Sequence, residues 1–427
     1  MNTTFGFSAP SNTPLPSNPI KNKQRKFIIA TQNVPPPPSL SSTIPQCHLT
    51  RFRFIPMPTH LLLLFTLLLT NLSAADPWSF LAPHSSPPSS LKLDPSPWRS
   101  PLLFEDGSPV QTPTDWPKRR SEILSTWHSL MGQWPPIITD PKPEILRSEP
   151  QPGFRRDRIR FQWTPLLHTE AWLLIPDNAK NAPGIITTYY EPDTAVGLSD
   201  KPDRDFALQL VKKGFVCLSI GTTESSADKT YAIHHPNIDH ATVQPLSMLA
   251  YAAANAFHVL ASRPEVDPAR IGITGHSYGG KWAMFASCLY DKFACAAWSD
   301  AGIVFDDTRP SINYWEPWYL GSHPRPWRQR GLITTDNPAR GLYPKLRAQG
   351  LDLHELHALM APRPFLVSGG SEDPPARWSP LQNSIAVNDL LGHPNRVFMT
   401  NRPDHAPNSE SNAVLVAFFE HFLKPSL

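Results

Sequence analysis

The chain has 427 residues, of which 40% are hydrophobic and 18% charged, and this is enough apolar sequence to bury a large core. Its formal net charge is +3, but six basic residues precede the first acidic residue, Asp76, and without them 33 basic residues stand against 36 acidic ones. The body of the chain therefore carries no basic surplus, which argues against a nucleic-acid-binding protein.

The start of the chain resembles a leader rather than a folded domain. Residues 61–70 (LLLLFTLLLT) form an apolar run, followed by a small-residue cleavage site with Ser73 at −3 and Ala75 at −1. The run is shorter than the roughly 20 apolar residues that a membrane span requires. We therefore predict a signal peptide over 57–75, a secreted or periplasmic protein without stable membrane insertion, and a basic prefix over 1–56 from a mis-assigned start. A disordered tail before a membrane anchor is the alternative.

Residues 76–156 are rich in proline, which predicts an N-terminal extension running over the domain surface, with one helix at about 118–132. From 157 to 427, strand and helix patterns alternate. Strands are expected at 157–163, 169–175, 183–190, 215–220, 270–275, 294–299, 364–369 and 396–400. Further helices are expected at 203–213, 245–262, directly after Ser277, and at 409–423. This order favours an α/β fold with a mostly parallel central sheet flanked by helices, and such sheets place their chemistry at the carboxyl ends of the strands.

A G-x-S-x-G motif follows the strand at 270–275, with Gly275, Ser277 and Gly279 as its fixed positions. In a nucleophile elbow, the serine occupies the strained apex between a strand and a helix, and small residues are needed where the strand and the helix pass closely. Because both flanking patterns are present here, we predict Ser277 as the nucleophile of a hydrolase.

A serine nucleophile needs a general base, and that base needs an acid that orients it. His405 lies in the loop before the last helix, where the fold places its histidine. Asp373 follows the strand at 364–369 in a G-x-x-D pattern and is the predicted acid. Asp300 and Glu372 remain as alternative acids.

The oxyanion hole is expected to use the amide of Tyr278, together with a second amide from Tyr190 or Glu191 in the loop after the third strand. No metal ligand spacing is found among the cysteines, so no metal and no organic cofactor are expected. A bridge between Cys288 and Cys295 is one alternative, and buried free thiols are the favoured one.

These residues resemble the α/β-hydrolase superfamily over about 157–427, through GHSYGG, GGSED and His405. Within it, the chain is similar to carbohydrate esterases of the acetyl xylan esterase and glucuronoyl esterase kind, whose Ser-Arg-x-Gly-Lys motif corresponds to Ser277 through Lys281. The resemblance implies that Lys281 contacts sugar hydroxyls, whereas Tyr278 stands where that family has an arginine. The SYGG run also resembles prolyl-oligopeptidase-type peptidases, which carry a large additional N-terminal domain.

An aromatic-rich insertion is expected between the sixth and seventh predicted strands, from 299 to 364. Its segment NYWEPWYLG makes Trp315 and Trp318 candidate substrate-binding residues, because aromatic faces stack on sugar rings. A lid packed by its own aromatic residues is the alternative. Together these features predict a serine esterase that cleaves a carboxylic ester, expected on a glycan or small-molecule substrate, through an acyl-enzyme on Ser277. A peptidase or a non-catalytic glycan-binding protein is the alternative, and the sequence gives no oligomeric state.

Overall fold

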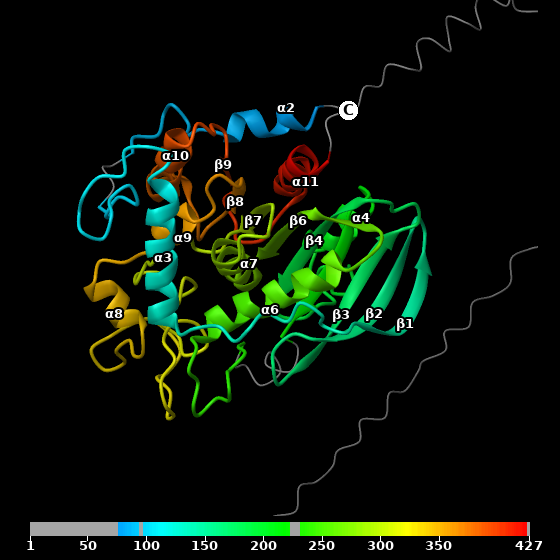
Figure 1. Ribbon diagram of the computed structural model, residues 1–427, viewed down its shortest axis with the longest axis horizontal. Helices are drawn as coiled ribbons and strands as arrows, with labels where there is room; N and C mark the ends of the chain where they lie inside the picture. The colour runs from blue at the N-terminus through cyan, green and yellow to red at the C-terminus, as the bar shows by residue number, and fades with distance from the viewer. Residues whose placement is uncertain (1–75, 94–96, 223–230, 425–427) are drawn as a thin grey trace, which may run out of the picture. The chain divides into compact units, whose positions relative to one another are not determined.

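The computed structural model describes residues 76–93, 97–222 and 231–424 (Figure 1). The predicted prefix and the predicted signal peptide lie outside these residues. Among the helices that are described, none combines the length and the apolar character needed to cross a membrane.

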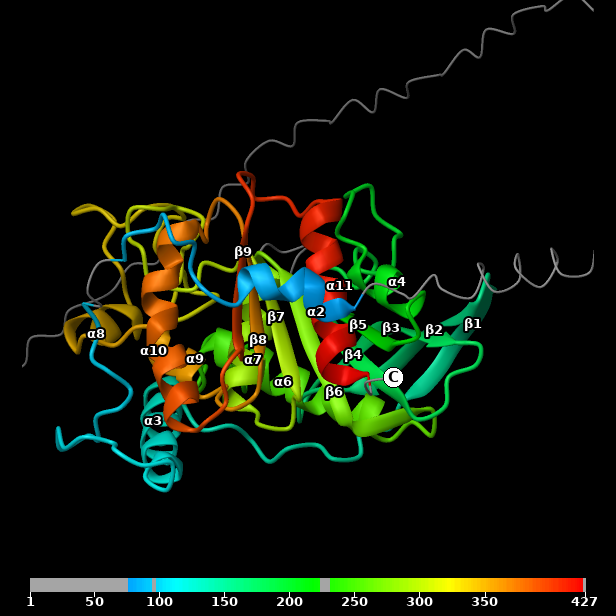
Figure 2. The same cartoon turned by 90° about the horizontal axis from the view of Figure 1, so that it is seen from above.

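A nine-stranded sheet forms the centre of the fold, in the order β1-β2-β3-β5-β4-β6-β7-β8-β9 (Figure 2). Strands β4 to β9 pair in parallel, whereas β1, β2 and β3 run antiparallel to their neighbours. The strands are β1 (Glu144–Gln151), β2 (Phe154–Gln162), β3 (His168–Pro176), β4 (Ala182–Tyr189), β5 (Val216–Gly221), β6 (Val266–His276), β7 (Cys295–Ser299), β8 (Phe365–Gly369) and β9 (Val397–Asn401). The carboxyl ends of the six parallel strands therefore lie along one edge of the sheet.

Helices cover both faces of the sheet. Helices α6 and α7 lie on one face, and α4 and α11 lie on the other, where α2 packs against α11 (Figures 1 and 2). The helices are α2 (Pro77–Leu81), α3 (Trp116–Met131), α4 (Phe206–Val211), α6 (Pro245–Ala261), α7 (Tyr278–Leu289), α8 (Tyr343–Ala348), α9 (His354–Ala358), α10 (Trp378–Leu390) and α11 (Ser409–Leu423), with short 3₁₀ turns at Ala82–His84 and Pro375–Arg377. The mostly parallel sheet flanked by helices confirms the predicted fold class.

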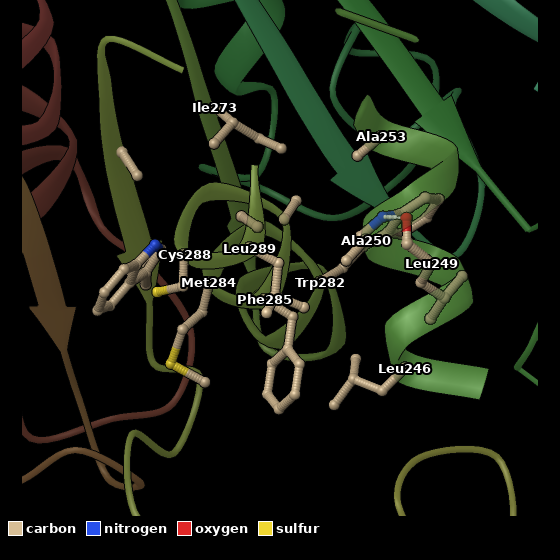
Figure 3. Close-up of a cluster of buried hydrophobic side chains, with 14 of the residues drawn as sticks. Leu246, Leu249, Ala250, Ala253, Ile273, Trp282, Met284, Phe285, Cys288 and Leu289 are labelled. Atoms are coloured by element: carbon tan, nitrogen blue, oxygen red, sulfur yellow. Dashed lines mark hydrogen bonds between the residues drawn. The ribbon is translucent and has the colours of Figure 1, made fainter. Parts of the chain in front are cut away.

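The packing of α6 against α7 fixes the helix that follows Ser277 (Figure 3). Small residues such as Ala250 and Ala253 on α6 let the two helices approach closely. The Trp282 indole of α7 fills the space between them, and its Nε1 donates to the Leu249 carbonyl at 2.5 Å. Because every residue of α7 is buried, this helix cannot shift without disturbing the core.

The predicted boundary between an extension and a domain is absent from the fold. Residue 157 lies inside β2, and all the described residues fall within one compact unit, Leu72–Leu427. The segment before residue 157 supplies the edge strand β1 and helix α3, which buries Trp116 and Trp127. Sequence patterning missed β1 because most of its side chains are exposed, so it lacks the apolar alternation that marks a half-buried strand.

The three described cysteines, Cys217, Cys288 and Cys295, are free and buried, which confirms the favoured prediction and excludes a bridge between Cys288 and Cys295. Burial raises the pKa of the Cys288 thiol to about 12, so it stays protonated and unreactive at neutral pH.

Candidate active site

Ser277 occupies a sharp turn between β6 and α7, as the motif predicts. Its backbone has φ 58° and ψ −113°, a conformation that costs free energy for a residue with a side chain. The turn is held because the Ser277 amide donates to the Ser299 carbonyl of β7 at 2.8 Å. The strained apex projects the hydroxyl beyond the carboxyl edge of the sheet.

The two motif glycines are required by steric contact. A Cβ on Gly279 would lie 1.8 Å from the Thr188 carbonyl oxygen, and one on Gly275 would lie 2.3 Å from Thr188 Oγ1. The first turn of α7 therefore passes β4 at a distance that only glycine allows. This contact places the N-terminus of α7, with its unpaired amides, directly behind Ser277.

A hydrogen-bonded chain links Ser277, His405 and Asp300. The Nε2 atom of His405 lies 2.8 Å from Ser277 Oγ, and its Nδ1 atom lies 2.6 Å from Asp300 Oδ2. His405 comes from the loop between β9 and α11, and its side chain is 36% exposed, whereas that of Asp300 is fully buried. The structure therefore brings together the predicted serine and the predicted histidine.

The predicted position of Asp373 beside His405 is wrong, because Asp300 occupies that place. The carboxylate of Asp373 points instead at the loop after β7, where its two oxygens accept the amides of Gly302 at 2.8 Å and Ile303 at 2.7 Å. The other alternative, Glu372, makes no bond to His405 that the described residues record. Asp300 directly follows β7 and has a positive φ of 47°, which turns its side chain toward His405.

The loops after β7 and β8 hold each other. While Asp373 accepts two amides from the first loop, Asp300 Oδ1 accepts the amides of Gly370 at 2.7 Å, Glu372 at 3.1 Å and Asp373 at 2.9 Å from the second. We call this arrangement the reciprocal clasp. Burial, and then the charge of Asp300, raise the pKa of Asp373 to about 6. Three amides and the His405 ring therefore hold Asp300, which is the carboxylate that faces the imidazole.

Arg402 fixes the loop that carries His405, and sequence reasoning missed it. Its guanidinium donates to the carbonyls of Ser368 at 2.9 Å and His405 at 2.8 Å, so it ties the end of β8 to the histidine loop. Arg402 is only 7% exposed. The sequence feature that could have identified Arg402 is its position directly after β9 and three residues before His405.

The residues expected at the oxyanion hole lie at the start of α7 and after β4. Tyr278 is the first residue of α7, so its amide has no partner within the helix. Its ring stacks on that of Tyr190 with 4.3 Å between centroids and 9° between planes. The Tyr278 hydroxyl donates to the Tyr231 carbonyl at 3.0 Å, which directs the ring away from Ser277 and leaves only the backbone amide of Tyr278 for an oxyanion. Glu191 follows Tyr190 in the same loop.

Comparisons with known proteins identify relatives of this chain by sequence. No model of a known protein family matches this chain. A 4-O-methyl-glucuronoyl methylesterase of Phanerochaete carnosa is 24% identical over 393 residues, covering 85% of this chain and 89% of that protein. A second one, from Schizophyllum commune, is 22% identical over about half of each chain.

Solved structures resemble the chain over most of its length. A glucuronoyl esterase from Solibacter usitatus superimposes with a TM-score of 0.61 at 19% identity and covers 77% of this chain and 98% of that one. The glucuronoyl esterase catalytic domain from Hypocrea jecorina gives 0.53 at 15% identity, over 79% and 91%. The chain has the α/β-hydrolase fold. At these identities, the structural likeness establishes the fold. The similarity of the chain to glucuronoyl esterases confirms the resemblance to carbohydrate esterases that the sequence predicts.

Lys281 lies inside the α/β-hydrolase core rather than facing the solvent. Its Nζ donates to the Ala301 carbonyl at 2.6 Å and lies 4.8 Å from the centre of the Tyr314 ring. Burial lowers the pKa of this ammonium group to about 8. Since Ala301 follows Asp300 directly, Lys281 contacts the same loop as the reciprocal clasp.

The insertion between β7 and β8 packs largely on itself. Trp315 is fully buried and donates to the Gly331 carbonyl at 2.8 Å, so it does not present a face to a ligand, contrary to the prediction. Trp318 is 7% exposed and lies 5.9 Å from the Tyr231 ring, which in turn packs beside Tyr190. Of the two tryptophans, only Trp318 belongs to the aromatic cluster around the start of α7.

Proposed function

We propose that this chain is a serine esterase that hydrolyses a carboxylic ester on a carbohydrate. The observation that carries the proposal is the unbroken chain of hydrogen bonds from Ser277 Oγ through His405 to Asp300 Oδ2. Such a chain is the arrangement that activates a serine for acyl transfer. Asp300, rather than Asp373, is the acid in this proposal.

In the first half of the reaction, His405 Nε2 takes the proton of Ser277 Oγ as the oxygen attacks the ester carbonyl carbon. The imidazolium that forms is stabilised by the Asp300 carboxylate, which accepts from Nδ1. The carbonyl oxygen becomes negatively charged and is stabilised by the Tyr278 amide and the N-terminus of α7. His405 then donates its proton to the leaving alcohol, and the acyl group stays on Ser277.

In the second half, water replaces the alcohol. His405 removes a proton from the water, which attacks the acyl carbon, and the collapse of the second tetrahedral intermediate returns the proton to Ser277 Oγ. Each step forms or breaks one C–O bond at the acyl carbon while His405 carries the proton, so the proposal requires no electron transfer.

The proposed substrate class rests on the comparisons. The two curated relatives are named as esterases of 4-O-methyl-glucuronoyl groups, and the superimposed solved structures are named as glucuronoyl esterases. We therefore expect a sugar ester, with an ester of a uronic acid as the first candidate and an acetylated xylan as the second. Tyr278 replaces the arginine that supports the oxyanion in the glucuronoyl esterase motif, so in this chain the oxyanion must be stabilised without that guanidinium.

The structure does not favour either alternative, a peptidase or a non-catalytic glycan-binding protein. A prolyl-oligopeptidase-type peptidase needs a further folded domain, yet the described part of 76–156 belongs to the same compact unit as the rest. A non-catalytic protein would be favoured if Ser277 lay far from His405, but Ser277 Oγ and His405 Nε2 are 2.8 Å apart.

Export is part of the proposal. Asp76, the first residue after the expected cleavage site, caps α2 by accepting the Trp78 amide at 3.1 Å, so a chain that begins there keeps its first helix. N-terminal sequencing of protein recovered from the medium or the periplasm should begin at Asp76, whereas a start upstream of residue 57 would contradict the predicted leader.

Hydrolysis of 4-nitrophenyl acetate by the purified chain tests the proposal, beside the Ser277→Ala variant and a Ser262→Ala control at a distant serine. We expect activity in the wild type and the control, and its loss by several orders of magnitude in Ser277→Ala. Release of methanol from methyl glucuronate and of acetate from acetylated xylan then ranks the two substrate candidates. Equal rates in the wild type and Ser277→Ala would reject the esterase mechanism.

A further inference from the structure

A cleft of about 490 Å³ opens at the carboxyl edge of the sheet, beside the proposed catalytic residues. Because β3 runs antiparallel to β5, the end of β2 and the start of β3 lie at the same edge as the carboxyl end of β6, which leads into Ser277. The described residues that line the cleft are Arg158, Arg160, Trp163, Leu167, His168, Thr169, Glu170, Gly221, Thr222, Ala232, Ile233 and His234. Its volume is within the range of small-molecule binding sites.

The cleft is connected to the proposed active site through Thr222. The Thr222 hydroxyl lies 3.1 Å from the hydroxyl of Tyr278, the residue after Ser277. The Thr222 amide donates to the Tyr190 carbonyl at 2.7 Å, and the Tyr190 ring stacks on Tyr278. One wall of the cleft is therefore hydrogen-bonded to the side chain of Tyr278, the residue that follows Ser277.

The charge in the cleft is concentrated on one unpaired guanidinium. Arg158 is neutralised by Glu170 at 3.0 Å and by Asp193 at 3.5 Å. Arg160 is exposed, and among the described residues no carboxylate pairs with it, although Glu144 and Glu170 stand opposite it in the strand register. Glu170 already binds Arg158. Within the described parts of the chain, Arg160 is therefore the arginine of the cleft that has no recorded carboxylate partner.

The remaining lining suits a sugar ring. Leu167, which is 46% exposed, offers apolar surface, and the hydroxyl of Thr169 offers a hydrogen-bonding group. Burial lowers the pKa of His234 to about 4, so this histidine adds no positive charge at neutral pH. A guanidinium beside apolar and hydroxyl groups selects a ligand with a carboxylate on a ring that is otherwise neutral.

We propose that this cleft binds a free uronate unit of the same glycan whose ester is cleaved at Ser277, with Arg160 holding the carboxylate. The inference rests on the proposed function for the position of the ester, but binding itself requires no catalysis. The unit bound in the cleft differs from the esterified unit at Ser277, because an ester carries no carboxylate charge for Arg160 to bind.

Calorimetric titration of the full-length Ser277→Ala variant tests binding separately from hydrolysis. The probes are trigalacturonate and its fully methyl-esterified form, which have the same sugar rings and differ in charge. We expect the acid to bind about five- to tenfold more tightly, as one guanidinium–carboxylate contact in a partly solvated cleft allows, and the difference to shrink at high salt.

Three substitutions in that background locate the contact. Arg160→Gln should abolish the preference for the acid, whereas Arg147→Gln should preserve it, because Arg147 is an exposed arginine of the same sheet outside the cleft. Glu170→Gln should increase the preference, since it leaves Arg158 with Asp193 alone, at 3.5 Å, as its carboxylate partner. Equal affinity for the two probes, or a preference that survives Arg160→Gln, overturns the cleft proposal. Failure of the wild type to hydrolyse 4-nitrophenyl acetate would reject the esterase proposal instead and leave the binding result standing.

Discussion

Replacing Asp300 by asparagine should damage catalysis far more than the same change at Asp373. In the wild type, Asp300 Oδ1 accepts three amides and Oδ2 faces His405 Nδ1. The asparagine carbonyl will keep the amide side, because only an acceptor fits there, and its NH₂ group will face Nδ1. The imidazole must then carry its proton on Nε2, toward Ser277, and a protonated Nε2 cannot act as the base.

The size of the two effects follows from these contacts. A wrong tautomer in other serine triads lowers kcat by about 10⁴, equivalent to about 5.5 kcal/mol of transition-state stabilisation. Asp373→Asn keeps one acceptor for the Gly302 and Ile303 amides and loses one charged hydrogen bond, worth roughly 1.5–3 kcal/mol. If all of that loss reaches Asp300, kcat falls between about 10- and 160-fold.

Steady-state kinetics with 4-nitrophenyl acetate at pH 8 measures both variants, with circular dichroism to establish that each is folded. The two losses require Asp300→Asn to be slower than Asp373→Asn by about 60-fold or more, with similar KM values. A folded Asp373→Asn enzyme that is the slower of the two would refute the assignment of Asp300 as the acid.

The other predictions concern packing, position and pH. Burial lowers the pKa of His357 to about 3, so the neutral histidine stabilises the fold fully above pH 6.5 and this stabilisation is lost as the pH falls toward 3. Relative to wild type, the free energy of unfolding of His357→Phe should therefore be about 2 kcal/mol higher at pH 5 than at pH 8, as measured by urea denaturation at both pH values. Gly279→Ala should prevent folding, because its Cβ meets the Thr188 carbonyl, and recovery of soluble protein checks this against Gly107→Ala, whose Cβ meets nothing within 4 Å. Lys281→Met should lower kcat and leave KM unchanged if its bond to the loop after β7 is its role, whereas a raised KM with unchanged kcat would restore the sugar-contact role.

The sequence predicted the parts of the site that depend on local pattern. Ser277 was found because a sharp turn between a strand and a helix demands glycines at fixed spacing, and His405 because it precedes the last helix. Asp300 and Asp373 could not be separated in the same way. Strands β7 and β8 are neighbours in the sheet, so residues that follow either one reach the same place. The positive φ of Asp300 and its bonds to the loop after β8 decide which carboxylate faces the imidazole, and both depend on the folded structure.

The errors in the insertion and at the N-terminus have a related cause. Trp315 and Trp318 lie three residues apart and have similar sequence surroundings, yet one is buried inside the insertion and the other joins the cluster near Tyr231. Tertiary packing of a long loop makes this distinction, and no periodicity records it. Strand β1 escaped detection because an exposed edge strand has no apolar face to bury.

The reciprocal clasp also bears on the order in which the enzyme becomes active. Its two halves are separated by about 70 residues of chain, and each loop takes its shape from amides or carboxylates of the other. Neither loop has its final conformation before β8 has docked beside β7, and contacts between distant parts of a chain form late in folding. Catalytic competence is therefore a property of the completed sheet, and during refolding it should appear after most of the secondary structure.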